Sequence, residues 1–166
     1  MKICLLASGS KGNAIIIESG RTRLLVDAGL SAREIRRRLE LVGIDPASLT
    51  ALLITHEHTD HVRGLGPLVR QLDLPVYLQS DLAGRLPDVG KTAAVREFVD
   101  GEEFTVNDLT IRPFAVTHDS LAPVGFTFSG ERGKVGLATD LGVSASPQPT
   151  RQLRSQLDLH RREAAV

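Results

Sequence analysis

A dense group of potential metal ligands follows an apolar segment in the first half of the chain. Three of the five histidines fall within residues 55–61, whose sequence is THEHTDH. The four apolar residues directly before this run (ALLI) predict a buried strand. If His56 and His58 keep the alternation of that strand, their imidazoles face the same side and can share one ion, while Asp60 and His61 lie on the following turn. The run therefore predicts two pairs of metal ligands where a strand ends.

An alternative interpretation is that these histidines belong to an ordinary solvated loop. Three imidazoles crowded together without a cation would repel one another when protonated, and they would gain little from burial. This crowding favours metal ligation by His56, His58, Asp60 and His61 over a plain loop.

The length and composition of the chain limit what can surround this run. A chain of 166 residues has room for one domain with a core, and 42% hydrophobic with 24% charged residues is typical of a soluble protein. We expect no membrane partner, because no apolar run approaches the roughly 20 residues that span a bilayer. The 20 basic and 20 acidic side chains cancel, so no overall positive charge points to nucleic acid. The single cysteine, Cys4, suits a reducing cytoplasm and is expected in the core.

The order of predicted elements indicates a layered α/β (α+β) domain. A capping box at Ser31 and Glu34 begins a helix that ends at Gly43, with an apolar stripe formed by Ile35, Leu39 and Val42. A second helix is expected near 65–72. A short helix is expected at 80–86. Apolar or alternating runs predict strands at 2–7, 14–18, 22–26, 51–54, 76–78, 103–106, 109–116, 123–129 and 134–139.

Three further polar residues follow predicted strands in the way that His56 does. They are Asp27, His118 and Asp140. Side chains at strand ends often converge on one rim of a sheet, even when they are far apart in sequence. The alternatives are a core histidine bonded to backbone for His118, and ordinary turn residues for the two aspartates.

In these residues and their order, the chain resembles the metallo-β-lactamase superfamily. The resemblance implies an αββα sandwich with its site at the strand ends. Residues 7–13, 26–29 and 138–142 are most similar to the YycJ-like branch, which implies a cytoplasmic protein with nuclease or phosphodiesterase activity on nucleic acid or another phosphodiester.

The same resemblance assigns ligands to two divalent metal ions. His56, His58 and His118 would hold the first ion, Asp60 and His61 the second, and Asp140 would bridge them, with Asp27 supporting the ligand loop. Imidazole and carboxylate ligands suit Zn²⁺, although Mn²⁺ and Fe²⁺ are also compatible. Two such ions about 3.5–4 Å apart can share a water whose pKa falls to about 7, so the bridging hydroxide would be the nucleophile and Asp60 would relay a proton. A histidine at position 58 favours hydrolysis over redox chemistry, because di-iron members generally carry an acidic residue there.

The end of the chain departs from this family pattern. Members usually continue well past the position of Asp140 and add a last histidine ligand, whereas here only His160 follows. We therefore expect an incomplete family domain at 1–142, lacking the C-terminal part of its second half, and a tail at 143–166 unlike the family, with a helix from about 150. A shortened second layer would expose an apolar sheet face and open strand edges.

Three functions stay open at this point. The first is hydrolysis of phosphodiesters, with nucleic acid as the preferred substrate, and a second is hydrolysis of a thioester or lactone. The third is a truncated, weakly active or non-catalytic fragment that binds metal at best. The Gly/Ser loop at 8–13 could present backbone N–H groups and Lys11 to a phosphate, but a plain β-turn explains it equally well. The oligomeric state is not determined by the sequence.

Overall fold

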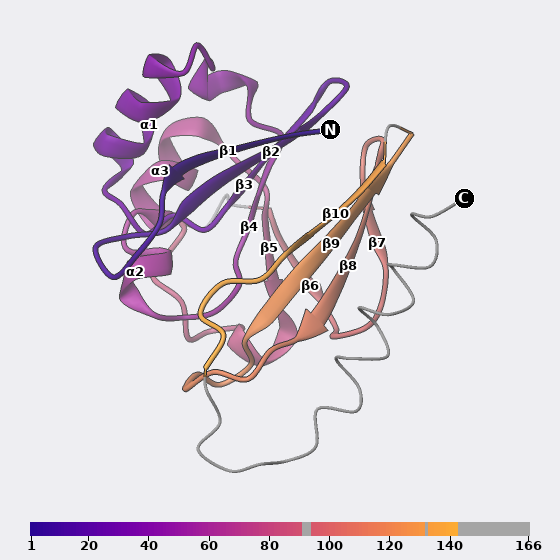
Figure 1. The fold of residues 1–166 in the computed structure, drawn as a ribbon. Helices are drawn as coiled ribbons and strands as arrows, with labels where there is room; N and C mark the ends of the chain where they lie inside the picture. Colours follow the sequence, from indigo (N-terminus) through magenta and orange to yellow (C-terminus); the bar gives the residue numbers. More distant parts are fainter. Residues whose placement is uncertain (91–93, 132, 143–166) are drawn as a thin grey trace.

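Two β-sheets pack face to face, and helices cover the outer face of the first sheet (Figure 1). The computed structural model describes residues 1–90, 94–131 and 133–142. Within these ranges the chain supplies a helical layer and two sheet layers of the predicted αββα sandwich. The predicted tail at 143–166, with its helix and His160, lies outside the described residues.

The first sheet has six strands in sequential order, antiparallel from β1 to β3 and parallel from β3 to β6. The second has four antiparallel strands in the order β10-β9-β8-β7. The strands are β1 (Lys2–Ala7), β2 (Ala14–Ser19), β3 (Thr22–Val26), β4 (Ala51–Leu53), β5 (Val76–Gln79), β6 (Val95–Phe98), β7 (Phe104–Val106), β8 (Leu109–Ala115), β9 (Val124–Gly130) and β10 (Gly133–Leu137). The helices are α1 (Ala32–Leu41), α2 (Thr59–Val62) and α3 (Leu65–Leu72), with 3₁₀ segments at Pro46–Ser48 and Ser80–Leu82.

Helix α1 begins and ends where its sequence predicts. The Ser31 hydroxyl accepts a hydrogen bond from the Glu34 backbone N–H at 3.3 Å, which caps the first turn. Ile35 and Leu39 are buried against the sheet, and Gly43 follows with a φ of 75°, a conformation that glycine adopts without strain. The cap by Ser31 and the burial of Ile35 and Leu39 are therefore as predicted, whereas Val42, the third residue of the predicted apolar stripe, is 48% exposed.

The two faces of the first sheet contribute to two separate hydrophobic cores. Alternate residues of the first sheet, such as Ile16 and Leu52, face helices α1 and α3. Their neighbours, such as Ile15 and Leu53, face the second sheet, where Phe126 and other apolar residues of β8 and β9 meet them. The alternation of side chains along a strand thus divides the apolar residues between a helix–sheet core and a sheet–sheet core.

Truncation of Phe126 to alanine should destabilise the fold by about 3–5 kcal/mol, as expected for a phenylalanine removed from a core. Phe126 is fully buried, and its ring centroid lies 5.5 Å from that of Phe98 and 6.0 Å from that of Phe128. Urea denaturation measures the loss. Leu41→Ala is the control, because Leu41 is 70% exposed and its truncation should change stability by about 0.5 kcal/mol or less. Equal effects of the two variants would contradict the sheet–sheet core.

Several sequence expectations need correction. The predicted short helix at 80–86 is only the 3₁₀ turn Ser80–Leu82. Strand β6 was not predicted, because three of its four residues are exposed and it lacks the alternating apolar signal. Cys4 is only partly buried, since it lies on the edge strand β1 rather than in the interior.

The outer face of the second sheet is also less apolar than expected. The residues of β8 and β9 that alternate with the buried ones include Thr110, Arg112, Thr127 and Ser129, which are polar. Phe114, on the same face of β8, is apolar and only partly buried, so the expected apolar face is limited to that residue within these two strands.

None of the helices in the described ranges is long and apolar enough to cross a membrane.

Candidate metal centre

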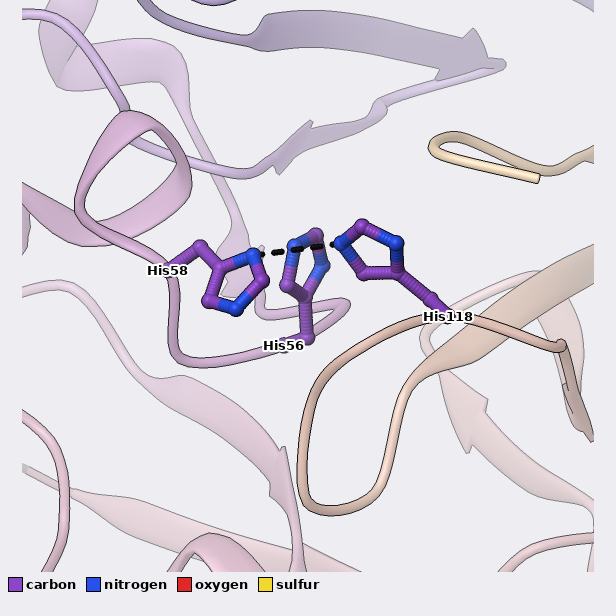
Figure 2. Close-up of side chains that lie close together, drawn as sticks. All are labelled: His56, His58 and His118. Carbon is purple, nitrogen blue, oxygen red and sulfur yellow. Dashed lines mark hydrogen bonds between the residues drawn. The ribbon is translucent and has the colours of Figure 1, made fainter. Parts of the chain in front are cut away.

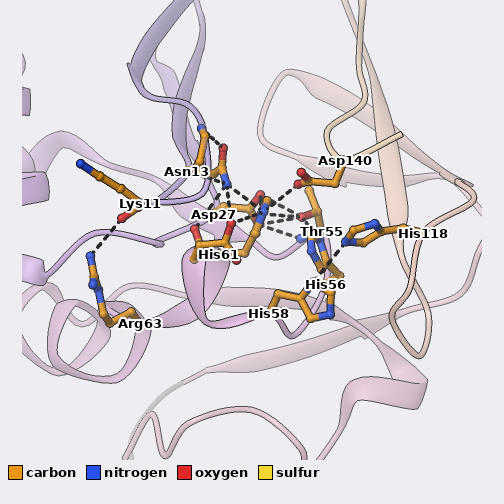
Figure 3. Close-up of polar contacts among 12 residues, drawn as sticks. Lys11, Asn13, Asp27, Thr55, His56, His58, His61, Arg63, His118 and Asp140 are labelled. Atoms are coloured by element: carbon orange, nitrogen blue, oxygen red, sulfur yellow. Dashed lines mark hydrogen bonds and ion pairs between the residues drawn. The ribbon is translucent and has the colours of Figure 1, made fainter. Parts of the chain in front are cut away.

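The predicted ligands gather at one rim of the two sheets, where four strands end (Figure 3). Asp27 follows β3, His56 follows β4, His118 follows β8 and Asp140 follows β10. Backbone hydrogen bonds hold these ends together, with Val124 N–H donating to Thr55 O at 3.0 Å. The convergence predicted from four separate strand ends is therefore observed.

Three histidines form the first group of ligand atoms (Figure 2). One ring nitrogen from each of His56, His58 and His118 lies within 4.8 Å of the others. The ring centroids are 4.7–4.9 Å apart, and His118 Nε2 is 3.1 Å from His58 Nδ1. These distances allow all three nitrogens to bind one ion, with no rearrangement of the backbone.

The route by which His56 and His58 meet differs from the expected one. Strand β4 ends at Leu53, so neither histidine lies on a strand and strand alternation does not pair them. They meet because the chain leaves β4 in a loop and enters the short helix α2 directly after His58. The two side chains lie together as predicted, but the predicted reason, strand alternation, is wrong, and their sharing of one ion stays a prediction.

His56 presents an unprotonated nitrogen to the centre. The Thr55 hydroxyl donates its proton to Asp27, at 2.8 Å from Oδ2, so it can only accept from His56 Nδ1 at 2.9 Å. The proton of His56 is therefore on Nδ1, which leaves a lone pair on Nε2. That Nε2 atom is buried and makes no hydrogen bond within the described part of the chain. Because buried nitrogens are nearly always paired, a cation at this position fits the site.

The surroundings of His56 also keep it neutral. Burial, and then the neighbouring His61, His58 and His118, lower the pKa of His56 to about 4. At neutral pH the imidazole is therefore in the form that binds a metal.

A second group of ligand atoms combines His56, His61 and Asp140, again within 4.8 Å of one another. His61 Nε2 is 2.8 Å from Asp140 Oδ2 and 3.7 Å from Asp60 Oδ2. Burial lowers the pKa of His61, but its hydrogen bond to Asp27 and the charges of Asp27, Asp140 and Asp60 outweigh burial and raise it. A metal ion can take the place of the proton that Asp140 and Asp60 attract to Nε2.

The two groups differ in part from the division that the resemblance implies. His56 belongs to both groups of ligand atoms, and Asp60 lies outside both. The Asp60 carboxylate is only partly buried and accepts a hydrogen bond from Asn13 Nδ2 at 3.3 Å. Its role as a ligand stays a prediction.

Asp27 supports the centre from behind rather than facing it. Its carboxylate is fully buried and accepts from Thr55 N–H at 2.9 Å, while His61 Nδ1 lies 2.7 Å away. Burial raises the pKa of Asp27, against the opposing effects of His61 and Thr55. The contact with His61 Nδ1 directs Nε2 of the same ring towards Asp140, as expected for a carboxylate behind a metal-binding histidine.

Sequence reasoning gave no role to three polar residues that shape this centre: Asn13, Thr55 and Glu57. Glu57 lies between two candidate ligands, and its Oε1 accepts from Leu121 N–H at 3.0 Å. This bond ties the loop of His56 and His58 to the loop that carries His118. Its sequence signal was its position inside THEHTDH, but its partner is 64 positions away and could not be read from that run.

Replacing Glu57 with alanine should weaken zinc binding by about 10–100-fold, because the His118 loop loses its tie to the ligand loop. Glu57→Gln should keep most of the affinity, since an amide oxygen can accept the same N–H. Competition with a coloured chelator measures both affinities. Glu97→Ala, which removes an exposed carboxylate from β6, should bind zinc normally. If Glu57→Gln binds as weakly as Glu57→Ala, the charge of Glu57 matters more than its hydrogen bond.

Comparison with known proteins agrees with this architecture. The family model described as "Metallo-beta-lactamase superfamily" matches residues 7–164. Exodeoxyribonuclease WalJ of Streptococcus pneumoniae is 36% identical over 146 residues, which are 85% of this chain and 54% of that protein. Exodeoxyribonuclease YycJ of Bacillus anthracis is 34% identical over 141 residues, 83% of this chain and 53% of that protein. The chain thus spans about half the length of these curated relatives.

Solved structures share the fold. A Cronobacter sakazakii metallo-β-lactamase with an HARLDQ motif aligns with a TM-score of 0.67 at 20% identity, covering 93% of this chain and 68% of that one. The metallo-β-lactamase fold protein YhfI of Bacillus subtilis aligns with a TM-score of 0.68 at 20% identity, covering 86% and 64%. The family match extends beyond residue 142, and the prediction of an unrelated tail stays a prediction.

Proposed function

This chain belongs to the metallo-β-lactamase superfamily, and on that basis we propose that it is a metal-dependent hydrolase of phosphodiester bonds in nucleic acid. The observation that carries the proposal is the convergence of two groups of ligand atoms that share His56. The donor set of imidazoles and carboxylates favours Zn²⁺, with Mn²⁺ or Fe²⁺ as alternatives. When bound, two such ions would supply Lewis acidity for the attacking water and for the phosphate oxygen.

Residues of this chain would bind the metal ions, orient the ligand side chains and move a proton at the centre. His56, His58 and His118 would bind one ion, and His61 with Asp140 and Asp60 the other, with Asp140 between the two. Asp27 and Thr55 hold His61 and His56 in the required tautomers through the hydrogen bonds described above. Asp60, a partly exposed carboxylate whose Oδ2 lies 3.7 Å from His61 Nε2, would be the group that moves a proton.

The choice of nucleic acid rests on the named activity of the two curated relatives, which are exodeoxyribonucleases. A cytoplasmic location is part of the same proposal. Because the chain spans about half the length of those relatives, the competing proposal is a weakly active or non-catalytic protein that binds metal. Hydrolysis of a thioester or lactone is the third.

One set of assays separates the three proposals. The purified chain is loaded with zinc, its metal content is counted, and it is offered bis-p-nitrophenyl phosphate, single-stranded DNA, duplex DNA and a thioester. We expect two ions and turnover of the phosphodiesters. One ion or none, with all four substrates intact, would favour the non-catalytic alternative, and selective thioester cleavage would overturn the choice of substrate.

A further inference from the structure

A pocket of about 480 Å³ adjoins the metal centre on the side of His61. It is lined by Ser10, Lys11, Thr59, Asp60 and Arg63. Asp60 therefore borders both the pocket and the centre. Lys11 and Arg63 lie together on the opposite side of the centre from His118 (Figure 3), and Arg63 Nη2 donates to the Lys11 carbonyl at 3.1 Å.

The lining of this pocket is suited to an anion. Lys11 and Arg63 are exposed, and neither forms an ion pair with another described residue. Ser10 and Thr59 add hydroxyl donors, and Arg63 can offer two parallel N–H groups to phosphate oxygens. The one acidic group in the lining is Asp60, whose charge would be offset by a cation in the adjoining centre.

The loop that forms one wall of the pocket is held in place. Gly12 N–H donates to Gly9 O at 2.9 Å, and Gly9 N–H donates to Asn13 Oδ1 at 3.0 Å. Gly12 has a φ of 146°, and a Cβ there would lie 2.8 Å from Gly29 O, so the close approach of the loop to that backbone requires glycine. Lys11 therefore lies on a loop that is packed against the backbone at Gly29, and this packing fixes its position more firmly than an isolated surface turn would.

We propose that this Lys11–Arg63 pocket binds the phosphate of the nucleotide next to the scissile bond. The inference rests on the proposed function, since it requires the scissile phosphate to lie at the metal centre formed by the two groups that share His56. A polynucleotide leaving the centre past Asp60 would bring its next phosphate to Lys11 and Arg63. The pocket would then select polymers over small phosphodiesters, which have no second phosphate to place in it.

The test compares a long and a short substrate. In zinc-loaded protein, the double substitution Lys11→Ala with Arg63→Ala should raise the KM for a single-stranded DNA oligonucleotide by about tenfold or more, the scale of one lost charged hydrogen bond. Turnover of bis-p-nitrophenyl phosphate should be unchanged. Fluorescence anisotropy should show weaker oligonucleotide binding by this variant. The slope of the logarithm of the binding constant against the logarithm of salt concentration should become shallower by about 0.7, the value for one phosphate contact on a single strand.

Matched controls are Arg21→Ala and Lys134→Ala, which remove exposed cations from the β2–β3 turn and from β10. Equal loss of oligonucleotide binding in these controls would overturn the proposed role of the pocket. So would an equal loss of turnover by the double variant on the oligonucleotide and on bis-p-nitrophenyl phosphate. An effect confined to 5′-phosphorylated oligonucleotides would assign the pocket to a terminal phosphate and contradict the position proposed here. If wild-type protein hydrolyses neither substrate, the proposed function fails, and the anisotropy comparison still decides the pocket.

Discussion

Zinc content should fall by one ion when His58 is replaced by alanine, and phosphodiester turnover should fall by at least about 100-fold. Loss of a residue that only supports a metal ligand costs up to about 100-fold, so loss of a ligand itself should cost at least as much. His58 Nδ1 lies 3.1 Å from His118 Nε2, so its loss leaves the first group with two nitrogens. The fold should tolerate the change, because the His58 side chain is only partly buried and forms no capping bond to α2.

Metal counting on dialysed protein, with urea denaturation of the apoprotein, measures this result. His160→Ala is the matched histidine control and should keep both ions. Loss of an ion in that control would identify His160 as the later ligand that the sequence left open. A His58→Ala protein that retains two ions and full activity would remove His58 from the centre.

The second large effect is expected at Gly29, where β3 runs into the loop before α1. A Cβ at this position would lie 1.6 Å from the Asp60 carbonyl oxygen and 2.5 Å from Asn13 N. Both neighbours are backbone atoms, so no side-chain rotation can relieve the collision. Gly29→Ala should therefore destabilise the protein by more than about 4 kcal/mol, in the range of severe packing defects, or prevent folding.

The same substitution should abolish zinc binding even if some folded protein remains. Three segments meet at Gly29: the segment after Asp27, the loop that carries Asn13, and helix α2, which carries Asp60 and His61. Gly136→Ala is the control, since a Cβ there meets nothing within 4 Å and its φ is outside the left-handed region. Urea denaturation and zinc titration of both variants measure the difference. Normal stability of Gly29→Ala would show that the three segments are packed less tightly than the contacts at Gly29 indicate.

Much of the fold follows from local signals in the sequence. Strands β1 to β5 and β7 to β10 carry apolar or alternating patterns, and α1 carries its own cap and stripe. The failures have physical causes. Exposed β6 gains its stability by pairing with β5, and the short helix α2 has no apolar period of its own to reveal it.

Within the candidate centre, the sequence by itself determined which atoms are available. Imidazole and carboxylate are properties of the residues, and their crowding in THEHTDH points to a metal without reference to the fold. Only the tertiary structure decided how those atoms are used. It placed Asp27 behind His61, made Thr55 set the tautomer of His56, and joined Glu57 to the loop of His118. Hydrogen bonds depend on distance and direction in space. Sheet pairing and loop packing bring Asp27 within 2.7 Å of His61 and Glu57 within 3.0 Å of Leu121, and the residue types alone do not specify these partners.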